Sequence, residues 1–193
     1  MNLAAKQQWP LLLPLPATMA AASVQIDGIA APLSYGSPLQ INTQVPWEVK
    51  PGSATLTVTH TGVAVSQTVT IAAAGPAIFT LYGSQEGAAL NQDYSVNAPN
   101  HPAAAGQAIL LFGTGLGAVS PAAASADPLS WVTPKVTATV GGAPADVSFA
   151  GLAPGFAGLW QINVALPAGI SDAVPVIVTV AGMASNAVTV WVK

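Results

Sequence analysis

The chain has 193 residues, of which 52% are hydrophobic and only 6% are charged. Its net charge of -3 comes from seven acidic residues and four lysines, so a surface that follows nucleic acid phosphates is excluded, because such surfaces need clustered cations. Cysteine is absent, which excludes disulfide bonds and thiolate metal sites.

An apolar stretch near the N-terminus, residues 11–16 followed by alanines at 20–22, imitates a secretory signal peptide. Only Lys6 stands in the basic region, and Pro14 and Pro16 interrupt a run that is already short. We therefore predict a loop inside a folded domain rather than an export signal. No other stretch reaches about 18 uninterrupted apolar residues, so we predict no membrane-spanning segment.

Polar and apolar residues alternate with a period of two over residues 55–59, 69–71, 174–180 and 187–192. This alternation, with its many Val and Thr residues, predicts half-buried β-strands. The 18 glycines and 17 prolines interrupt the chain too often for helices of ordinary length. Glycines stand where hairpins would turn, at Gly28, Gly62, Gly141, Gly142 and Gly182. We predict an all-β fold of antiparallel β-sandwiches.

The two halves of the chain carry the same pattern. Residues 26–35 correspond to residues 140–149, and the Gln-Ile-Asn at 40–42 returns at 161–163. The copies are 114 residues apart at the first segment and 121 apart at the second, so the second copy carries an insertion. This repetition predicts two tandem domains of one kind. We assign residues 1–72 to the first repeat, 73–103 to a hairpin and linker, and 104–193 to the second repeat.

Several segments together resemble a known family over nearly the whole chain. They are residues 2–4, 15–18, 31–33, 40–48, 114–117 and 150–163. The segments are similar to an uncharacterised C-terminal domain family found at the ends of large secreted proteins of soil acidobacteria. The resemblance implies immunoglobulin-like sandwiches of the IPT/TIG kind, an extracellular or cell-surface location, and no known catalytic residues.

The first repeat departs from that family at its start. In the family an apolar strand precedes the segment that resembles residues 2–4, as residues 109–112 precede residues 114–117 here. We therefore expect the first repeat to lack its first strand and to expose a sheet edge that can pair with another chain. In the alternative, the N-terminal segment folds back over the gap, or the edge is tolerated as a loosely packed end.

The residue types that commonly carry catalysis form no coherent set. The glycine motif at residues 113–117 lacks the spacing of a dinucleotide loop, and His60 and His101 are too few for a three-histidine zinc site. A carboxylate pair such as Glu48 with Asp93 stays open, because carboxylate separation is a tertiary property. We predict that the protein is not an enzyme and that it uses neither a cofactor nor a metal.

Tryptophans are the first group of candidate binding residues. We expect Trp160 in a core or between domains, because a large aromatic side chain dominates the packing of a small sandwich. Trp47 and Trp191 are the candidates for a ligand site or an interface, where exposed rings could stack on sugars or on a protein.

The repeated amides are the second group, Gln40 with Asn42 and Gln161 with Asn163. They could bind a ligand, but their repetition favours a shared structural role in which they hydrogen-bond loop backbone. The sequence as a whole predicts a non-catalytic extracellular structural, spacer or adhesion module that self-associates or binds another domain of its parent protein. The alternative is a carbohydrate-binding module that uses exposed tryptophans.

Overall fold

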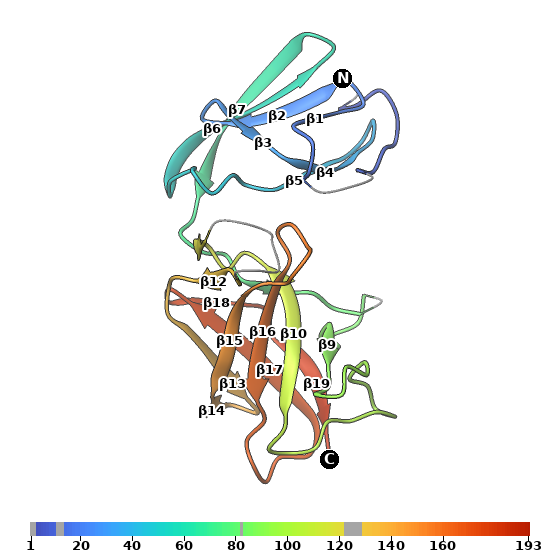
Figure 1. Ribbon diagram of the computed structural model, residues 1–193, viewed down its shortest axis with the longest axis vertical. Helices are drawn as coiled ribbons and strands as arrows, with labels where there is room; N and C mark the ends of the chain where they lie inside the picture. Colours follow the sequence, from blue (N-terminus) through green and yellow to red (C-terminus); the bar gives the residue numbers. More distant parts are fainter. Residues whose placement is uncertain (1–2, 11–13, 82, 122–128) are drawn as a thin grey trace. The chain divides into compact units, whose positions relative to one another are not determined.

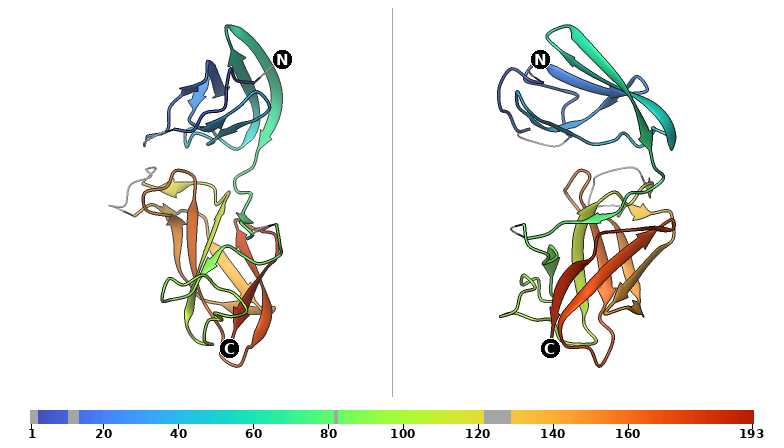
Figure 2. Two further views of the ribbon diagram at one scale, coloured as in Figure 1. Left: turned by 90° about the vertical axis from the view of Figure 1, so that its right-hand side faces the viewer. Right: turned by 180° about the vertical axis from the view of Figure 1, so that it is seen from behind.

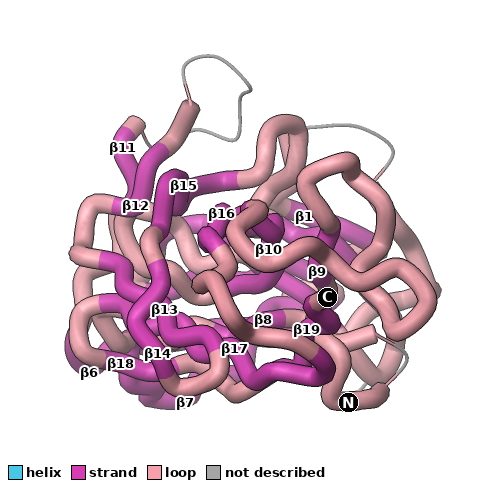
Figure 3. The backbone as a smooth tube through the Cα atoms, turned by 90° about the horizontal axis from the view of Figure 1, so that it is seen from below, coloured by secondary structure: helices cyan, strands magenta, loops and turns pink. Residues whose placement is uncertain are grey.

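The computed structural model describes residues 3–10, 14–81, 83–121 and 129–193. These residues form strands, turns and loops, and Figure 3 draws no helix among them. The prediction of an all-β fold is therefore confirmed. Residues 14–17 form a loop as expected, whereas residues 11–13 of the same predicted loop lie outside the described residues, as do Asn2 and Tyr82.

The chain divides into two compact units, Met1–Ala73 and Ala74–Lys193, and Figure 1 labels most of their strands. The strands of the first unit are β1 (Thr18–Met19), β2 (Ala22–Ile26), β3 (Ile29–Ala31), β4 (Leu33–Gly36), β5 (Ile41–Thr43), β6 (Gly52–His60) and β7 (Val63–Ile71). One antiparallel sheet has the order β1-β2-β6-β7, with β3 paired to β2, and β4 pairs with β5 in another. The core of this unit includes Val24, Ile26 and Leu33.

The second unit is a β-sandwich of two antiparallel sheets. Its strands are β8 (Ala77–Ile78), β9 (Ala89–Leu90), β10 (Ala108–Thr114), β11 (Val119–Ser120), β12 (Trp131–Val132), β13 (Val136–Val140), β14 (Ala143–Ala145), β15 (Val147–Leu152), β16 (Trp160–Ala165), β17 (Asp172–Val180), β18 (Met183–Ala184) and β19 (Val188–Val192). One sheet has the order β11-β12-β15-β16-β10-β8, with β9 paired to β10. The other has the order β14-β13-β17-β18, with β19 paired to β17.

Side chains from both sheets of this unit fill one continuous core that includes Ile109, Trp160 and Val178. Two antiparallel sheets around such a core form the sandwich of immunoglobulin-like domains. The sheet that contains β17 and β19, red at the back of Figure 1, faces the viewer in the right-hand view of Figure 2.

The two units pair their strands in the same register. Val24 of β2 lies opposite Val58 of β6, and Ala138 of β13 lies opposite Val178 of β17. The equivalent residues are 114 positions apart in β2 and β13 and 120 apart in β6 and β17. The sequence repeat is therefore also a repeat of strand pairing.

An irregularity in the ladder is repeated as well. The register of β4 against β5 shifts between Leu33 and Tyr35, and that of β15 against β16 shifts between Val147 and Phe149. Each shift lies at the same position of the repeat, 114 residues apart. A β-bulge of this kind is a specific feature of a strand pair, so its presence in both units supports their equivalence.

Tight hairpins turn at the glycines predicted from the sequence. Four two-residue turns have positive φ at both positions: Asp27 (49°) and Gly28 (76°), Thr61 (50°) and Gly62 (81°), Gly141 (59°) and Gly142 (84°), and Ala181 (50°) and Gly182 (82°). Positive φ at both central residues gives a turn whose twist matches that of antiparallel strands. This prediction is confirmed at each glycine.

Residues 74–81 and 83–106 close one side of the second sandwich. Their strands β8 and β9 pair with β10 of one sheet. Gly87 and Ala103 donate backbone hydrogen bonds to Thr189 and Trp191 of β19 in the other sheet, both at 2.9 Å. The described part of the predicted hairpin and linker thus packs on the second sandwich, and domain boundaries at residues 72 and 103 stay predictions.

Two asparagine side chains join this closing segment to the sandwich through hydrogen bonds. Asn97 is 2% exposed, and its Oδ1 accepts from Trp191 N at 2.7 Å while its Nδ2 donates to Trp191 O at 2.8 Å. Asn186 contacts Ile78 in the same way, at 2.8 Å and 3.0 Å. Each side-chain amide therefore takes the place of a neighbouring strand's backbone.

We predict that Asn97→Ala destabilises the second unit by roughly 1–3 kcal/mol, because it leaves the N–H of Trp191 without its acceptor, whereas the carbonyl oxygen of Trp191 keeps its bond from Ala103. Urea unfolding followed by tryptophan fluorescence measures the loss. Asn100→Ala, at an exposed turn position nearby, is the matched control and should stay within about 0.5 kcal/mol of the wild type. Equal midpoints for the two variants would contradict the role given to Asn97.

Candidate functional site

Strand β5 has a neighbour on one side only. Among the described residues it pairs with β4, and no strand lies on its other side. The equivalent strand in the second unit, β16, has β15 on one side and β10 on the other. The described part of the first unit therefore contains no counterpart of the β10 pairing.

The backbone of β5 presents hydrogen-bonding groups on this open side. Gln44 N donates to Pro32 O at 2.9 Å, which directs Gln44 toward β4. Because backbone groups alternate in direction along a strand, the N–H and C=O of Ile41 and Thr43 point away from β4. These are the positions whose equivalents in β16 bond to β10.

Apolar side chains beside the open edge are more exposed than their equivalents in the second unit. Leu39 is 89% exposed, whereas Trp160, at the same position relative to the repeated Gln-Ile-Asn, is 2% exposed. Ile41 is half-buried, whereas Ile162 is fully buried. The difference arises where β10 covers the second unit.

The long hairpin of the first unit shows the same difference. Leu56 and Val58 of β6 are half-buried, although the equivalent valines of β17 are fully buried. Residues 74–114 supply the cover in the second unit, through β10 and the segment that bonds to β19.

The N-terminal segment contacts the end of β4. Leu3 N donates to Pro38 O at 2.9 Å, and Gln8 and Gly36 exchange backbone hydrogen bonds of 2.8 Å and 3.1 Å. Ala4 is fully buried. In the part of the chain that the structure describes, this segment does not pair with β5, so it does not take the place that β10 has in the second unit.

The repeated amides bond to each other. Gln161 Nε2 donates to Asn163 Oδ1 at 2.8 Å, and Gln40 Nε2 donates to Asn42 Oδ1 at 2.6 Å. Alternate residues of a strand project from one face, and the core residues of β16 project from the other, so each pair lies on the outer face of its sheet. The expected bonds to loop backbone are thus replaced by a bond within each pair, and a ligand role stays untested.

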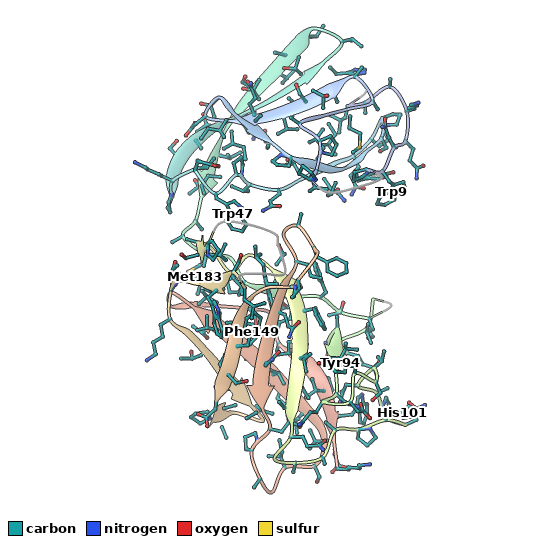
Figure 4. The ribbon with its side chains drawn as sticks, viewed as in Figure 1. Trp9, Trp47, Tyr94, His101, Phe149 and Met183 are labelled. Atoms are coloured by element: carbon teal, nitrogen blue, oxygen red, sulfur yellow. The ribbon has the colours of Figure 1, made fainter. Side chains whose placement is uncertain are left out.

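An aromatic pair lies next to the amides of the second unit. Phe149 of β15 is directly opposite Asn163, so both side chains project from the same face. Trp131, which is 47% exposed, contacts Phe149 edge to face, with ring centroids 4.8 Å apart and an interplanar angle of 70°. Figure 4 labels Phe149 on this sheet.

The first unit repeats this arrangement. Tyr35 is directly opposite Asn42, and Trp9, which is 60% exposed, lies with its ring centroid 4.4 Å from that of Tyr35. Figure 4 labels Trp9 at this position. We call these two groups the amide–aromatic faces: Trp9, Tyr35, Gln40 and Asn42 in the first unit, and Trp131, Phe149, Gln161 and Asn163 in the second.

Sequence reasoning found the amides but missed their aromatic neighbours. Tyr35 and Phe149 occupy the same position of the repeat, and this shared position is the sequence signal that could have identified them as partners of the amides. Trp9 and Trp131 come from non-equivalent segments, so no spacing in the sequence relates them. Only the fold brings each tryptophan to its aromatic partner.

Gly151 gives Phe149 room to lie over the sheet. A Cβ atom at this position would collide with the carbonyl oxygen of Ser130 and would lie 2.8 Å from Cζ of Phe149. Because Gly151 has no side chain, the Phe149 ring can lie over it. There the ring contacts Trp131, the residue directly opposite Gly151 on β12.

The tryptophans predicted as ligand or interface residues lie elsewhere. Trp47 is half-buried in the loop after β5 and is labelled in Figure 4. Trp191 is half-buried on β19, and its Nε1 donates to Glu86 Oε1 at 3.3 Å. No aromatic ring contact joins either residue to another described residue. Their binding roles stay predictions.

The acidic and histidine side chains are dispersed. The described residues contain no group of three or more His, Asp or Glu that could hold a metal ion. Asp93 caps a turn, because its Oδ1 accepts from Ser95 Oγ at 2.6 Å and from Ser95 N at 3.0 Å, and these bonds lower the pKa of its carboxyl group. Glu48, the residue named with Asp93 as an example of a carboxylate pair, belongs to the first unit, whereas Asp93 belongs to the second.

The described residues also include no helix that is long and apolar enough to cross a bilayer.

No protein-family model matches the chain, and no curated protein matches it. The solved structures with some likeness include SGBP-B of the Bacteroides ovatus mixed-linkage glucan utilization locus, in complex with a mixed-linkage heptasaccharide. It is 14% identical, with a TM-score of 0.34, over 90% of this chain and 36% of that chain. The chain thus spans little more than a third of that protein.

Two other solved structures are similarly distant. Domains 4 and 5 of the S-layer protein SbsC are 14% identical, with a TM-score of 0.26 over 96% of this chain and 78% of theirs. A tandem of titin Ig domains is 11% identical, with a TM-score of 0.30 over 90% of this chain and 82% of its own. Because these TM-scores are low, the fold assignment depends on the strand pairing of the chain itself. The ligands and assemblies of these proteins are not assigned to this chain.

We predict that Gly151→Ala destabilises the second unit by roughly 1–3 kcal/mol, because the new methyl group overpacks against Phe149 and the Ser130 carbonyl. It should also displace the Phe149 ring and so change the near-UV circular dichroism of Trp131. Gly75→Ala, whose Cβ would meet no heavy atom within 4 Å, is the control. A Gly151→Ala variant with the wild-type spectrum and stability would show that the ring does not depend on this glycine.

Proposed function

We propose that this chain is a non-catalytic extracellular module of the IPT/TIG kind that acts in structure or adhesion by accepting a β-strand from a protein partner. The acceptor is the open edge of β5. The observation that carries this proposal is that, within the described residues, β5 has one neighbouring strand where the equivalent β16 has two. The extracellular location is supported by the family resemblance of the sequence.

The second unit indicates what chemistry the accepted strand needs. β10 alternates in burial, with Ile109 and Leu111 fully buried and Leu110 and Phe112 half-buried. A strand with this period of two places one apolar row over the core and leaves the other on the outer face. The partner is therefore an extended segment with apolar residues at alternate positions, recognised through main-chain hydrogen bonds.

The repeat also gives the register. Leu111 lies opposite Ile162, and Ile109 lies opposite Val164. Transferred to the first unit, these pairs place the two inward positions of the incoming strand opposite Ile41 and Thr43.

The test uses the full chain and a soluble peptide that carries the sequence of residues 108–114 between lysine tails. We expect saturable binding by fluorescence anisotropy, and slower hydrogen exchange of the Ile41 and Thr43 amides. A peptide N-methylated at the positions of Ile109 and Leu111 should bind at least about tenfold more weakly, because it lacks the donors that face β5.

The matched control peptide is N-methylated at the positions of Leu110 and Phe112, whose amides face away from β5. It should bind like the unmodified peptide. Equal weakening by both methylation patterns, or no binding of the unmodified peptide, would contradict strand acceptance. If light scattering finds that the chain self-associates and that the peptide dissolves the assembly, the partner is a second copy of the chain.

A further inference from the structure

We propose that the amide–aromatic face of the second unit is a binding site for a neutral, extended polysaccharide. This site lies on the outer face of the sheet, so it is separate from the open edge of β5 and does not depend on the strand acceptance proposed above. Its residues are Trp131, Phe149, Gln161 and Asn163, joined on β10 by Leu110 and Phe112.

The first step is that these side chains form rows across four neighbouring strands. Trp131, Gly151, Gln161 and Phe112 lie successively opposite one another on β12, β15, β16 and β10. With strands about 4.8 Å apart, Trp131 and Phe112 are separated by roughly 14 Å. A linear ligand that crosses the strands would therefore meet an aromatic ring, an amide and a second aromatic ring in sequence.

A parallel row lies beside the first. Phe149, Asn163 and Leu110 are opposite one another on β15, β16 and β10. Phe79, which is 46% exposed, extends the aromatic surface beyond Phe112, to whose carbonyl oxygen its backbone N donates at 3.0 Å. Exposed aromatic side chains gathered on one face of a sheet are the usual mark of an interaction site.

The amides supply the polar part of recognition. The bond from Gln161 Nε2 to Asn163 Oδ1 fixes the two side chains relative to each other. It leaves Gln161 Oε1 as an acceptor and Asn163 Nδ2 as a donor, and neither makes a further hydrogen bond within the described part of the chain. Adjacent hydroxyls of a sugar ring both donate and accept, so an acceptor beside a donor matches them.

The charge of the face selects among glycans. None of the residues in the two rows is charged. An anionic polysaccharide would find no lysine or arginine here to compensate its charge. A neutral sugar presents an apolar C–H face, which packs on the electron-rich face of an aromatic ring, and hydroxyls at its rim, which reach the amides. The rings and the amides together therefore fit a neutral sugar chain.

The repetition of the arrangement is an independent observation. The first unit carries Trp9 against Tyr35 and the bonded pair of Gln40 and Asn42, in the same strand register. A core role would not require these rings at the surface, and a hydrogen bond between exposed amides contributes little to stability. The described part of the first unit has no counterpart of β10 beside this face, so the face offers fewer contacts and should bind more weakly.

The test measures binding of neutral β-1,4- and β-1,3-linked glucan hexasaccharides to the full chain by isothermal titration calorimetry and by quenching of tryptophan fluorescence. We expect binding of at least one of them, and much weaker binding of an oligogalacturonate of equal length. Trp131→Ala should raise the Kd at least about tenfold, Trp131→Phe should recover part of the affinity, and Gln161→Ala should weaken binding too.

Phe156→Ala is the control, since it removes a 59% exposed aromatic side chain from the loop between β15 and β16, outside both rows, and it should leave the Kd unchanged. Because Trp131 is 47% exposed, its variants should keep the urea midpoint of the wild type, which separates lost binding from lost folding. The proposal is overturned if neither neutral glucan binds at millimolar concentration, or if binding is indifferent to Trp131. It is also overturned if Trp131→Ala changes only the oligomeric state.

Discussion

The pairing of β10 with β16 is the interaction on which the second unit depends and by which the two units differ. It adds a strand whose Ile109 and Leu111 are fully buried, and it gives the closing segment, through β8 and β9, a strand to pair with. Where that pairing exists, Trp160 and Ile162 are buried; where the described chain has no such strand, Leu39 and Ile41 are partly or largely exposed. One strand therefore decides whether the same repeat is closed or open.

The repeated Gln-Ile-Asn strand shows how much one short segment carries. Its central isoleucine points inward to the core, its flanking amides point outward and bond to each other, and its backbone edge faces a neighbouring strand or solvent. The three directions are independent, because alternate side chains and the backbone groups project along different axes. The two proposals use different directions of this strand, the edge in the first unit and the outer face in the second.

Both proposals describe binding without catalysis. Among the described residues, the carboxylates and histidines are spread over turns, loops and strand ends, whereas aromatic rings and amides are gathered on the outer faces. In the two proposals, recognition depends on backbone hydrogen bonds, aromatic surface and side-chain amides, none of which needs a charged side chain. Main-chain pairing suits a protein strand, and aromatic rings with amides suit a sugar, so the same module could join a protein assembly to a polysaccharide.

The sequence by itself determined the strands, the hairpin turns and the repeat, because each depends on local pattern: the period of two in β17, the glycines of the type I′ turns, and the twin Gln-Ile-Asn. It also located the amides of the candidate site. Only the tertiary structure decided which residues accompany them, since Trp131 reaches Phe149 through a strand pair opposite Gly151. The structural roles of Asn97 and Asn186 could not be predicted from the sequence either, because each side chain hydrogen-bonds a strand that is distant in the chain. Contacts of this kind are set by which strands become neighbours, and local sequence does not encode that choice.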